Sequence, residues 1–279
     1  MIIDFHTHIF SPAVKERKMD YVRRDPLFAQ LYADPNARLA TVDELIQTMD
    51  DQGVTASVVL NIGWSSPALC CESNDYIIES VARYPKKLFG FAMVDFNSPE
   101  TAINELARCV KNGIRGVGEV RFSSAQLSDS REIQPILDYI IEKELIMMVH
   151  TSEPVGHSYP GKGDSTPDLL YPFIKSSPKL KLICAHWGGG MPFYFLMPEV
   201  KKALSQVYFD SAASPYLYSP GIYHQMASLV GDQKLLFGSD YPLLTPKRLL
   251  QEIESLNLPA LTRERLLYTN AAALLEISE

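Results

Sequence analysis

Short apolar runs alternate with longer amphipathic stretches along the whole chain. Eight runs rich in Val, Ile, Leu and Phe are predicted as strands, at residues 1–5, 56–61, 88–95, 115–122, 145–150, 180–186, 207–212 and 234–240. Their nearly continuous apolarity, in place of strict alternation, is typical of strands that are covered on both faces, as in a parallel sheet.

The amphipathic stretches between these runs predict helices. Residues 41–53 offer Thr41 or Asp43 as the N-cap and end on a glycine. Residues 98–113 begin with Ser98 at the N-cap and Pro99 at the first helical position, and also end on a glycine. A closing helix is predicted from about residue 262 to residue 275.

Each of the eight predicted strands is followed by a predicted helix, and the composition does not change along the chain. This order predicts one (β/α)₈ barrel, a TIM barrel, that spans residues 1–279 as a single domain. Two connections are too long to be simple turns, residues 9–40 and 151–167. Both follow the carboxyl end of a strand, which is the face where such barrels build their active sites.

Charge and cysteine content exclude several classes of function. The formal net charge of −7 and the pI near 5.4 argue against a nucleic-acid surface, which would need clustered Lys and Arg. No apolar run is long enough to span a bilayer, and no segment resembles a secretory signal. The four cysteines contain no C-x-x-C pair. We therefore expect a cytoplasmic protein with reduced, buried or incidental thiols and no membrane or nucleic-acid partner.

Polar residues cluster at the carboxyl ends of the predicted strands. Four of the six histidines and two carboxylates take such positions, namely His6, His8, Glu119, His150, His186 and Asp240. Imidazole nitrogens and carboxylate oxygens suit zinc and its first-row neighbours. Alternate residues of a strand share a face about 6.6 Å apart, so His6 and His8 could hold one ion. A lone H-x-H pair is weak evidence, but the meeting of four strand ends predicts a metal site.

Four motifs, in order, resemble the amidohydrolase superfamily. They are "DFHTH" at the first strand, "MMVHTSE" at the fifth, "CAHWGGG" at the sixth and "FGSDYP" at the eighth. The set is similar to the branch of amidohydrolase-related proteins that includes aminocarboxymuconate-semialdehyde decarboxylase. This resemblance implies a divalent metal, most often zinc, bound by His6, His8, His150 and Asp240. It further implies that His186 acts on the substrate or on a metal-bound water.

Glu119, in "GVGEVRF", departs from the decarboxylase pattern. Hydrolytic relatives with two metals use a strand-four carboxylate or modified lysine as a bridge, and the segment is also similar to the glutamate strand of TatD-type hydrolases. Glu119 could equally pair with Arg121, which is two residues away on the same face. The sequence therefore does not decide whether the site binds one ion or two.

Further residues are candidates for chemistry and for substrate binding. Asp240 is expected to take a proton from the activated water and return it to the leaving group, while His186 stabilises the developing oxyanion. Arg121 could hold a substrate carboxylate. Trp64 could stack on a planar substrate or anchor a loop. His157 lies in the loop after the fifth strand, which could close as a lid.

Two reactions fit these residues. The first is metal-dependent hydrolysis of a small amide, ester or lactone, and the second is non-oxidative decarboxylation of an aromatic or unsaturated acid. A third interpretation is a binding barrel that holds the ion without chemistry. Release of carbon dioxide would separate the second from the first. The expected partner is a small-molecule substrate in each case. The sequence does not decide whether the chain forms a homodimer.

Overall fold

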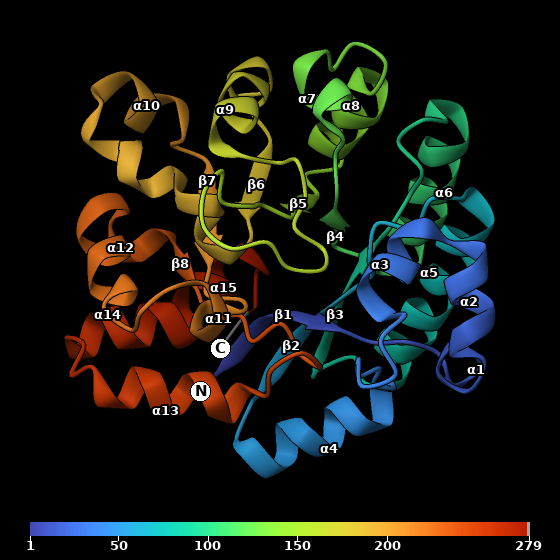
Figure 1. Ribbon diagram of the computed structural model, residues 1–279, viewed down its shortest axis with the longest axis horizontal. Helices are drawn as coiled ribbons and strands as arrows, with labels where there is room; N and C mark the ends of the chain where they lie inside the picture. The colour runs from blue at the N-terminus through green and yellow to red at the C-terminus, as the bar shows by residue number, and fades with distance from the viewer. Residues whose placement is uncertain (278–279) are drawn as a thin grey trace.

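The computed structural model describes residues 1–277, in which eight parallel strands form one sheet in the order of the sequence. The strands are β1 (Ile3–His8), β2 (Ala56–Leu60), β3 (Leu88–Ala92), β4 (Gly116–Val120), β5 (Ile146–Val149), β6 (Lys181–Cys184), β7 (Val207–Asp210) and β8 (Leu235–Leu236). A parallel bridge from Thr7 to Tyr241, and a 2.7 Å hydrogen bond from the Phe5 amide to the Phe237 carbonyl, join the two edges of the sheet. The sheet thus forms a barrel inside a ring of helices (Figure 1), which confirms the predicted TIM barrel.

Helices follow each strand. The α-helices are α1 (Pro12–Glu16), α2 (Lys18–Arg24), α3 (Pro26–Tyr32), α4 (Val42–Gln52), α5 (Pro67–Arg83), α6 (Pro99–Lys111), α7 (Ser124–Ser128), α8 (Gln134–Glu142), α9 (Pro167–Ser176), α10 (Pro198–Ala203), α11 (Ser214–Leu217), α12 (Ile222–Val230), α13 (Pro246–Ser255), α14 (Ala260–Glu264) and α15 (Asn270–Leu274). Tighter or wider helical turns form η1 (His186–Leu196), η2 (Asp232–Lys234) and η3 (Arg265–Thr269). No helix within residues 1–277 combines the length and the apolar character that crossing a bilayer requires.

The caps of two helices show how the local sequence sets their ends. In α4 the Thr41 side chain accepts from the Glu44 amide while the Glu44 carboxylate accepts from the Thr41 amide, and Gly53 ends the helix in the left-handed conformation. In α6 the predicted Pro99 start is present, but the Ser98 hydroxyl donates to Asp95 instead of capping the helix. The Asp95 carboxylate also accepts from the Asn97 amide, which folds the turn that leads into α6.

The core has two layers because successive strand residues face opposite sides of the sheet. Met147 packs against the helices and Met148 packs inside the barrel, and Leu182 and Ile183 divide in the same way. Residues of α15, including Ala271, pack against the interior layer. The strands therefore need apolar residues on both faces, as their sequence indicates.

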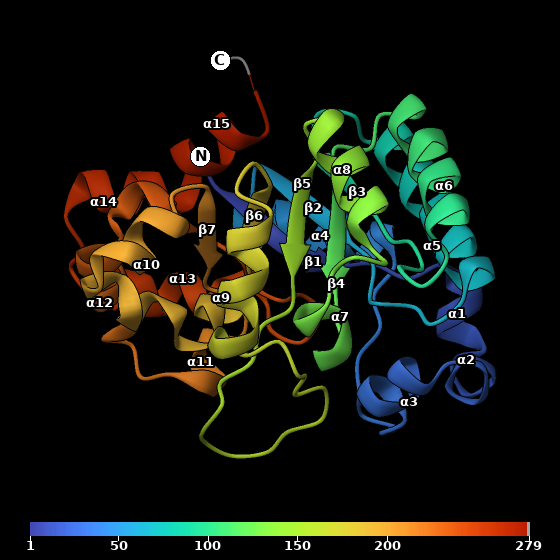
Figure 2. The ribbon, with the colours of Figure 1, turned by 90° about the horizontal axis from the view of Figure 1, so that it is seen from above.

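The structure adds elements to the predicted ones. The connection 9–40 contains the short helices α1, α2 and α3, and the closing helix is built from α14, η3 and α15. Figure 2 shows α3, α11 and the loop that follows β5 gathered at one end of the barrel, while the N-terminus and α15 lie at the other. The strands end where these connections gather, so this end carries the candidate site.

Candidate metal centre and active site

The pairing register shifts in two strands that carry candidate ligand residues. The pairing of β1 with β2 shifts between Asp4 and Thr7, and the pairing of β4 with β5 shifts between Val117 and Val120. His6 and Glu119 lie within these shifted segments and are both buried. Bulges commonly re-aim a side chain next to an active site.

His6, His8 and Glu119 form the first group of donor atoms. The Nε2 atoms of His6 and His8 lie 3.1 Å apart, and Glu119 Oε1 lies 3.8 Å from His6 Nε2. The donor atoms of the three residues all lie within 4.8 Å of one another. The shared face that the H-x-H spacing predicts is therefore present.

Glu119 also belongs to a second group, with His150 and His186. Its Oε1 lies 3.0 Å from His150 Nδ1 and 3.1 Å from His186 Nε2, and those two nitrogens are 3.1 Å apart. The structure thus places Glu119 between two histidine pairs. Its contact with Arg121 is longer, 3.9 Å between Oε2 and Nη2.

Asp240 lies against the first group. Its Oδ1 is 3.4 Å from His8 Nε2 and 3.6 Å from His6 Nε2. Burial opposes ionisation of Asp240 and Glu119, yet the surrounding histidines outweigh it and hold the pKa of both carboxyls below its usual range. Both side chains are accordingly carboxylates, the form that binds a cation.

Residues outside this cluster hold three of the histidine rings. His6 Nδ1 donates to Asp210 at 2.9 Å, His186 Nδ1 donates to the Ala212 carbonyl at 3.1 Å, and His150 Nε2 faces Ser152 Oγ at 3.2 Å. The remaining ring nitrogen of each therefore faces the cluster. His8 Nδ1 is buried without a hydrogen-bond partner within the described chain.

The donor set fits a divalent cation. Facing imidazole nitrogens 3.1 Å apart, in rings of which three are bonded outward through their other nitrogen, can share a proton or a cation. Two adjacent carboxylates add the negative charge that a cation neutralises. Nitrogen and carboxylate donors suit zinc, manganese and their neighbours, and either one ion or two could be held.

A cavity of about 550 Å³ opens over the cluster. His8, Glu119, His150, His186 and Asp240 line it, so both residues assigned to catalysis face the cavity. The predicted substrate residues Arg121 and His157 also line it, together with Tyr32 and Arg38 from the first long connection. The sequence analysis missed Tyr32 and Arg38, because only the folded connection brings residues 31–38 over the barrel.

Trp64 lies elsewhere. Its ring is buried and stacks on Phe28 at 5.2 Å between centroids, with 12° between the planes. It packs in an aromatic group with Tyr21 and does not line the 550 Å³ cavity. This placement matches the loop-anchoring alternative for Trp64, because Phe28 belongs to α3.

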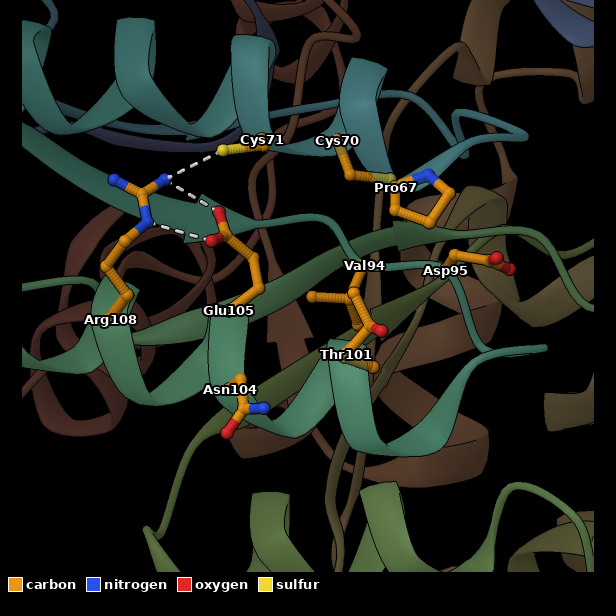
Figure 3. Close-up of a pocket in the computed structure, with 10 residues that line it drawn as sticks. Pro67, Cys70, Cys71, Val94, Asp95, Thr101, Asn104, Glu105 and Arg108 are labelled. Atoms are coloured by element: carbon orange, nitrogen blue, oxygen red, sulfur yellow. Dashed lines mark hydrogen bonds and ion pairs between the residues drawn. The ribbon is translucent and has the colours of Figure 1, made fainter.

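A second cavity, of about 340 Å³, lies between α5 and α6 (Figure 3). Its cation, Arg108, bonds to Glu105 and Asp75, so no free positive charge is available there. Cys71 lies 3.6 Å from Arg108 Nη2, and Cys70 is buried beside it. Burial raises the pKa of the Cys70 thiol, and all four cysteines are free, as expected of incidental thiols.

Known proteins resemble this chain in sequence and in fold. The chain is 23% identical to 2-amino-3-carboxymuconate-6-semialdehyde decarboxylase of Dictyostelium discoideum, over 96% of this chain and 90% of that protein. The crystal structure of 5-carboxyvanillate decarboxylase from Sphingomonas paucimobilis superposes with a TM-score of 0.81 at 17% identity and covers 99% of both chains. A dihydroxybenzoic acid decarboxylase from Polaromonas with bound manganese superposes with a TM-score of 0.75 at 17% identity, over 99% of this chain and 97% of that one.

The family assignment rests on nearly the whole sequence. The four motifs that suggested it lie on β1, after β5, after β6 and after β8, and the structure brings their histidines and aspartate to one cluster. The sequence profile of the amidohydrolase family matches residues 3–277. The chain therefore belongs to the amidohydrolase family.

Proposed function

We propose that the protein is a divalent-metal-dependent, non-oxidative decarboxylase of a small aromatic or unsaturated carboxylic acid. The observation that carries the proposal is the position of Arg121, whose guanidinium lines the same cavity as the histidine and carboxylate cluster. Its Nε is buried without a hydrogen-bond partner within the described residues. A planar cation that lines a cavity next to a cation site favours an organic anion as the substrate.

The relatives support the acid class. The curated relative and both solved structures named above are decarboxylases of unsaturated or aromatic acids. The cavity of about 550 Å³ suits a single substituted ring, and the side chains of Leu31, Tyr32 and Ile62 offer it apolar walls. Arg38, exposed at the same cavity, adds positive charge to its lining.

The protein's own residues divide the reaction between binding and proton transfer. A divalent cation, when bound by His6, His8, His150 and Asp240, would supply positive charge beside the substrate carboxylate. Arg121 holds and orients the anion. Asp240 lines the cavity as a carboxylate, takes a proton from water and delivers it to the substrate carbon. His186, held by Ala212, stabilises the charge that develops on the substrate oxygen.

The bonds balance without any oxidant. The carbon–carbon bond to the carboxylate breaks, carbon dioxide leaves, and the electron pair stays on the substrate carbon. That carbon forms a new bond to the proton from Asp240. One carboxylate anion and one proton thus give carbon dioxide and the shortened product, and the hydroxide left by the water that supplied the proton goes to solvent.

Hydrolysis is the second candidate, and Glu119 favours it. One carboxylate shared by two histidine pairs resembles a bridge between two ions, which could activate a water for attack on an amide, ester or lactone. The number of metal ions per chain distinguishes hydrolysis from decarboxylation. Glu119→Gln should lower a content of two ions per chain to one if Glu119 is a bridge.

The test is carbon dioxide release. The protein loaded with Zn²⁺ or Mn²⁺ is incubated with dihydroxybenzoates, carboxylated vanillates and unsaturated dicarboxylic acids, and evolved carbon dioxide is measured against Asp240→Asn. Release that needs metal and Asp240 supports the proposal. Turnover of lactones, esters or amides with no release from any acid would overturn it in favour of hydrolysis.

A further inference from the structure

The loop of residues 151–166, between β5 and α9, contacts residues of the candidate site at two places. Ser152 Oγ lies 3.2 Å from His150 Nε2, and Arg121 Nη1 donates to the Gly161 carbonyl. Within the loop, the Gly163 amide donates to Ser152 Oγ at 2.9 Å. The loop is also closed on itself by the Ser152 amide, which donates to the Ser165 carbonyl at 3.1 Å. Residues 161–163 therefore have a defined position over the cavity.

Close packing keeps this part of the loop against the site. A Cβ at Gly163 would lie 3.3 Å from the His150 ring, and a Cβ at Gly161 would lie 2.4 Å from the Leu31 side chain. Gly161 also adopts a positive φ of 86°. Glycines at both positions allow the loop backbone to lie directly on His150 and on α3.

Ser152 joins residues 161–163 of the loop to His150. It is fully buried, and its Oγ contacts both the Gly163 amide and His150 Nε2. The opposite nitrogen of the ring, Nδ1, faces Glu119 and His186. A ring that offers the Nδ1 lone pair to a cation carries its proton on Nε2, and a hydroxyl oxygen can accept that proton and the Gly163 amide together.

We propose that Ser152 is a positioning residue that fixes His150 with Nδ1 toward the cation and couples cation binding to the order of residues 161–163. The link is the pair of hydrogen bonds that Ser152 Oγ accepts, one from His150 Nε2 and one from the Gly163 amide. Cation binding would fix the orientation of the His150 ring. The hydrogen bond from the ring would then fix Ser152, whose Oγ accepts the bond that orders the Gly163 amide. The proposal rests on the cation site of the proposed function but not on the reaction.

Calorimetric titration with Zn²⁺ or Mn²⁺ tests the positioning role. Ser152→Ala should bind the cation about 10- to 100-fold more weakly, the usual cost of removing a partner of a ligand histidine. Ser152→Thr keeps the hydroxyl and should restore most of the affinity. Ser165→Ala is the matched control, because Ser165 is buried in the same loop but contacts Ser152 through its carbonyl, which alanine retains.

Two further readouts test the coupling. In wild type, added Zn²⁺ should slow hydrogen exchange of the amides of residues 161–163, and in Ser152→Ala this protection should be lost. The visible absorption bands of the Co²⁺-loaded protein should shift in Ser152→Ala and not in Ser165→Ala. The wild-type exchange experiment needs no variant, so a failure of Ser152→Ala to fold would not prevent the test.

The outcomes separate this inference from the proposed function. Unchanged cation affinity in Ser152→Ala, or exchange at residues 161–163 that does not respond to the cation, would overturn the role of Ser152 while leaving the metal centre intact. A wild-type protein that binds no divalent cation would overturn both. Normal cation binding and coupling without carbon dioxide release would contradict only the decarboxylase.

Discussion

Replacement of Arg121 by methionine tests the substrate assignment directly. Methionine keeps an apolar stem but removes the guanidinium that lines the cavity. Hydrogen bonds to charged groups contribute about 1.5–3 kcal/mol, so loss of one contact with a substrate carboxylate should cost about 2–3 kcal/mol. At 1.4 kcal/mol per factor of ten, kcat/KM for the acid should fall about 30- to 150-fold.

The assay is steady-state carbon dioxide release by wild type, Arg121→Met and Arg121→Lys. Lysine keeps the charge without the planar fork, so an intermediate loss is expected. Arg108→Met is the matched control, since Arg108 is paired at the separate cavity between α5 and α6 and should leave kcat/KM unchanged. Cation affinity of Arg121→Met should not weaken, because Arg121 supplies no ligand. A change in kcat/KM below twofold, or an equal loss of cation binding, would refute the assignment.

Two other variants test the support of the site. Asp210→Asn should weaken Zn²⁺ binding about 10- to 100-fold in calorimetry, because Asp210 holds His6 Nδ1 at 2.9 Å, and unchanged affinity would show that His6 needs no such partner. Gly189→Ala should lower the free energy of unfolding in urea by about 2 kcal/mol or more, because its Cβ would lie 2.4 Å from the Ser152 carbonyl oxygen at a φ of 58°. Gly221→Ala, with no atom within 4 Å of the new Cβ, is its control and should change the unfolding energy little. Equal effects at the two glycines would contradict the packing argument.

The fold could be predicted from the chain because each strand is apolar on both faces and most helices carry their own boundary signals. Helices α1 and α3 carry the same signals, Ser11 before Pro12 and Asp25 before Pro26, and both side chains cap as those signals suggest. Their short length, 5 and 7 residues, gives no amphipathic repeat, so the pattern alone showed only a long connection. The amphipathic repeat thus predicts the long helices, whereas short helices such as α1 and α3 are indicated only by their capping residues.

The site was predictable only as far as strand topology reaches. Strand ends converge in any such barrel, so His6, His150 and Asp240 could be placed together before their distances were known. The residues that hydrogen-bond to the histidine rings from outside the cluster cannot be placed from the convergence of strand ends. Ser152 lies two residues after His150, a candidate ligand, in an irregular loop, and Arg38 reaches the cavity through a folded connection. Such contacts depend on lateral packing, which leaves no periodic trace in the sequence.

Hydrolysis and decarboxylation could not be separated from the sequence because they draw on the same donors. Both need a cation, a carboxylate that moves a proton and a histidine that stabilises an oxyanion. The structure adds two observations that point in different directions. The guanidinium of Arg121 at the cavity favours an anionic substrate, whereas the position of Glu119 between two histidine pairs favours two ions. These observations are compatible if a second ion neutralises Glu119, because the guanidinium of Arg121 would then not have to balance the charge of Glu119 and could bind the substrate.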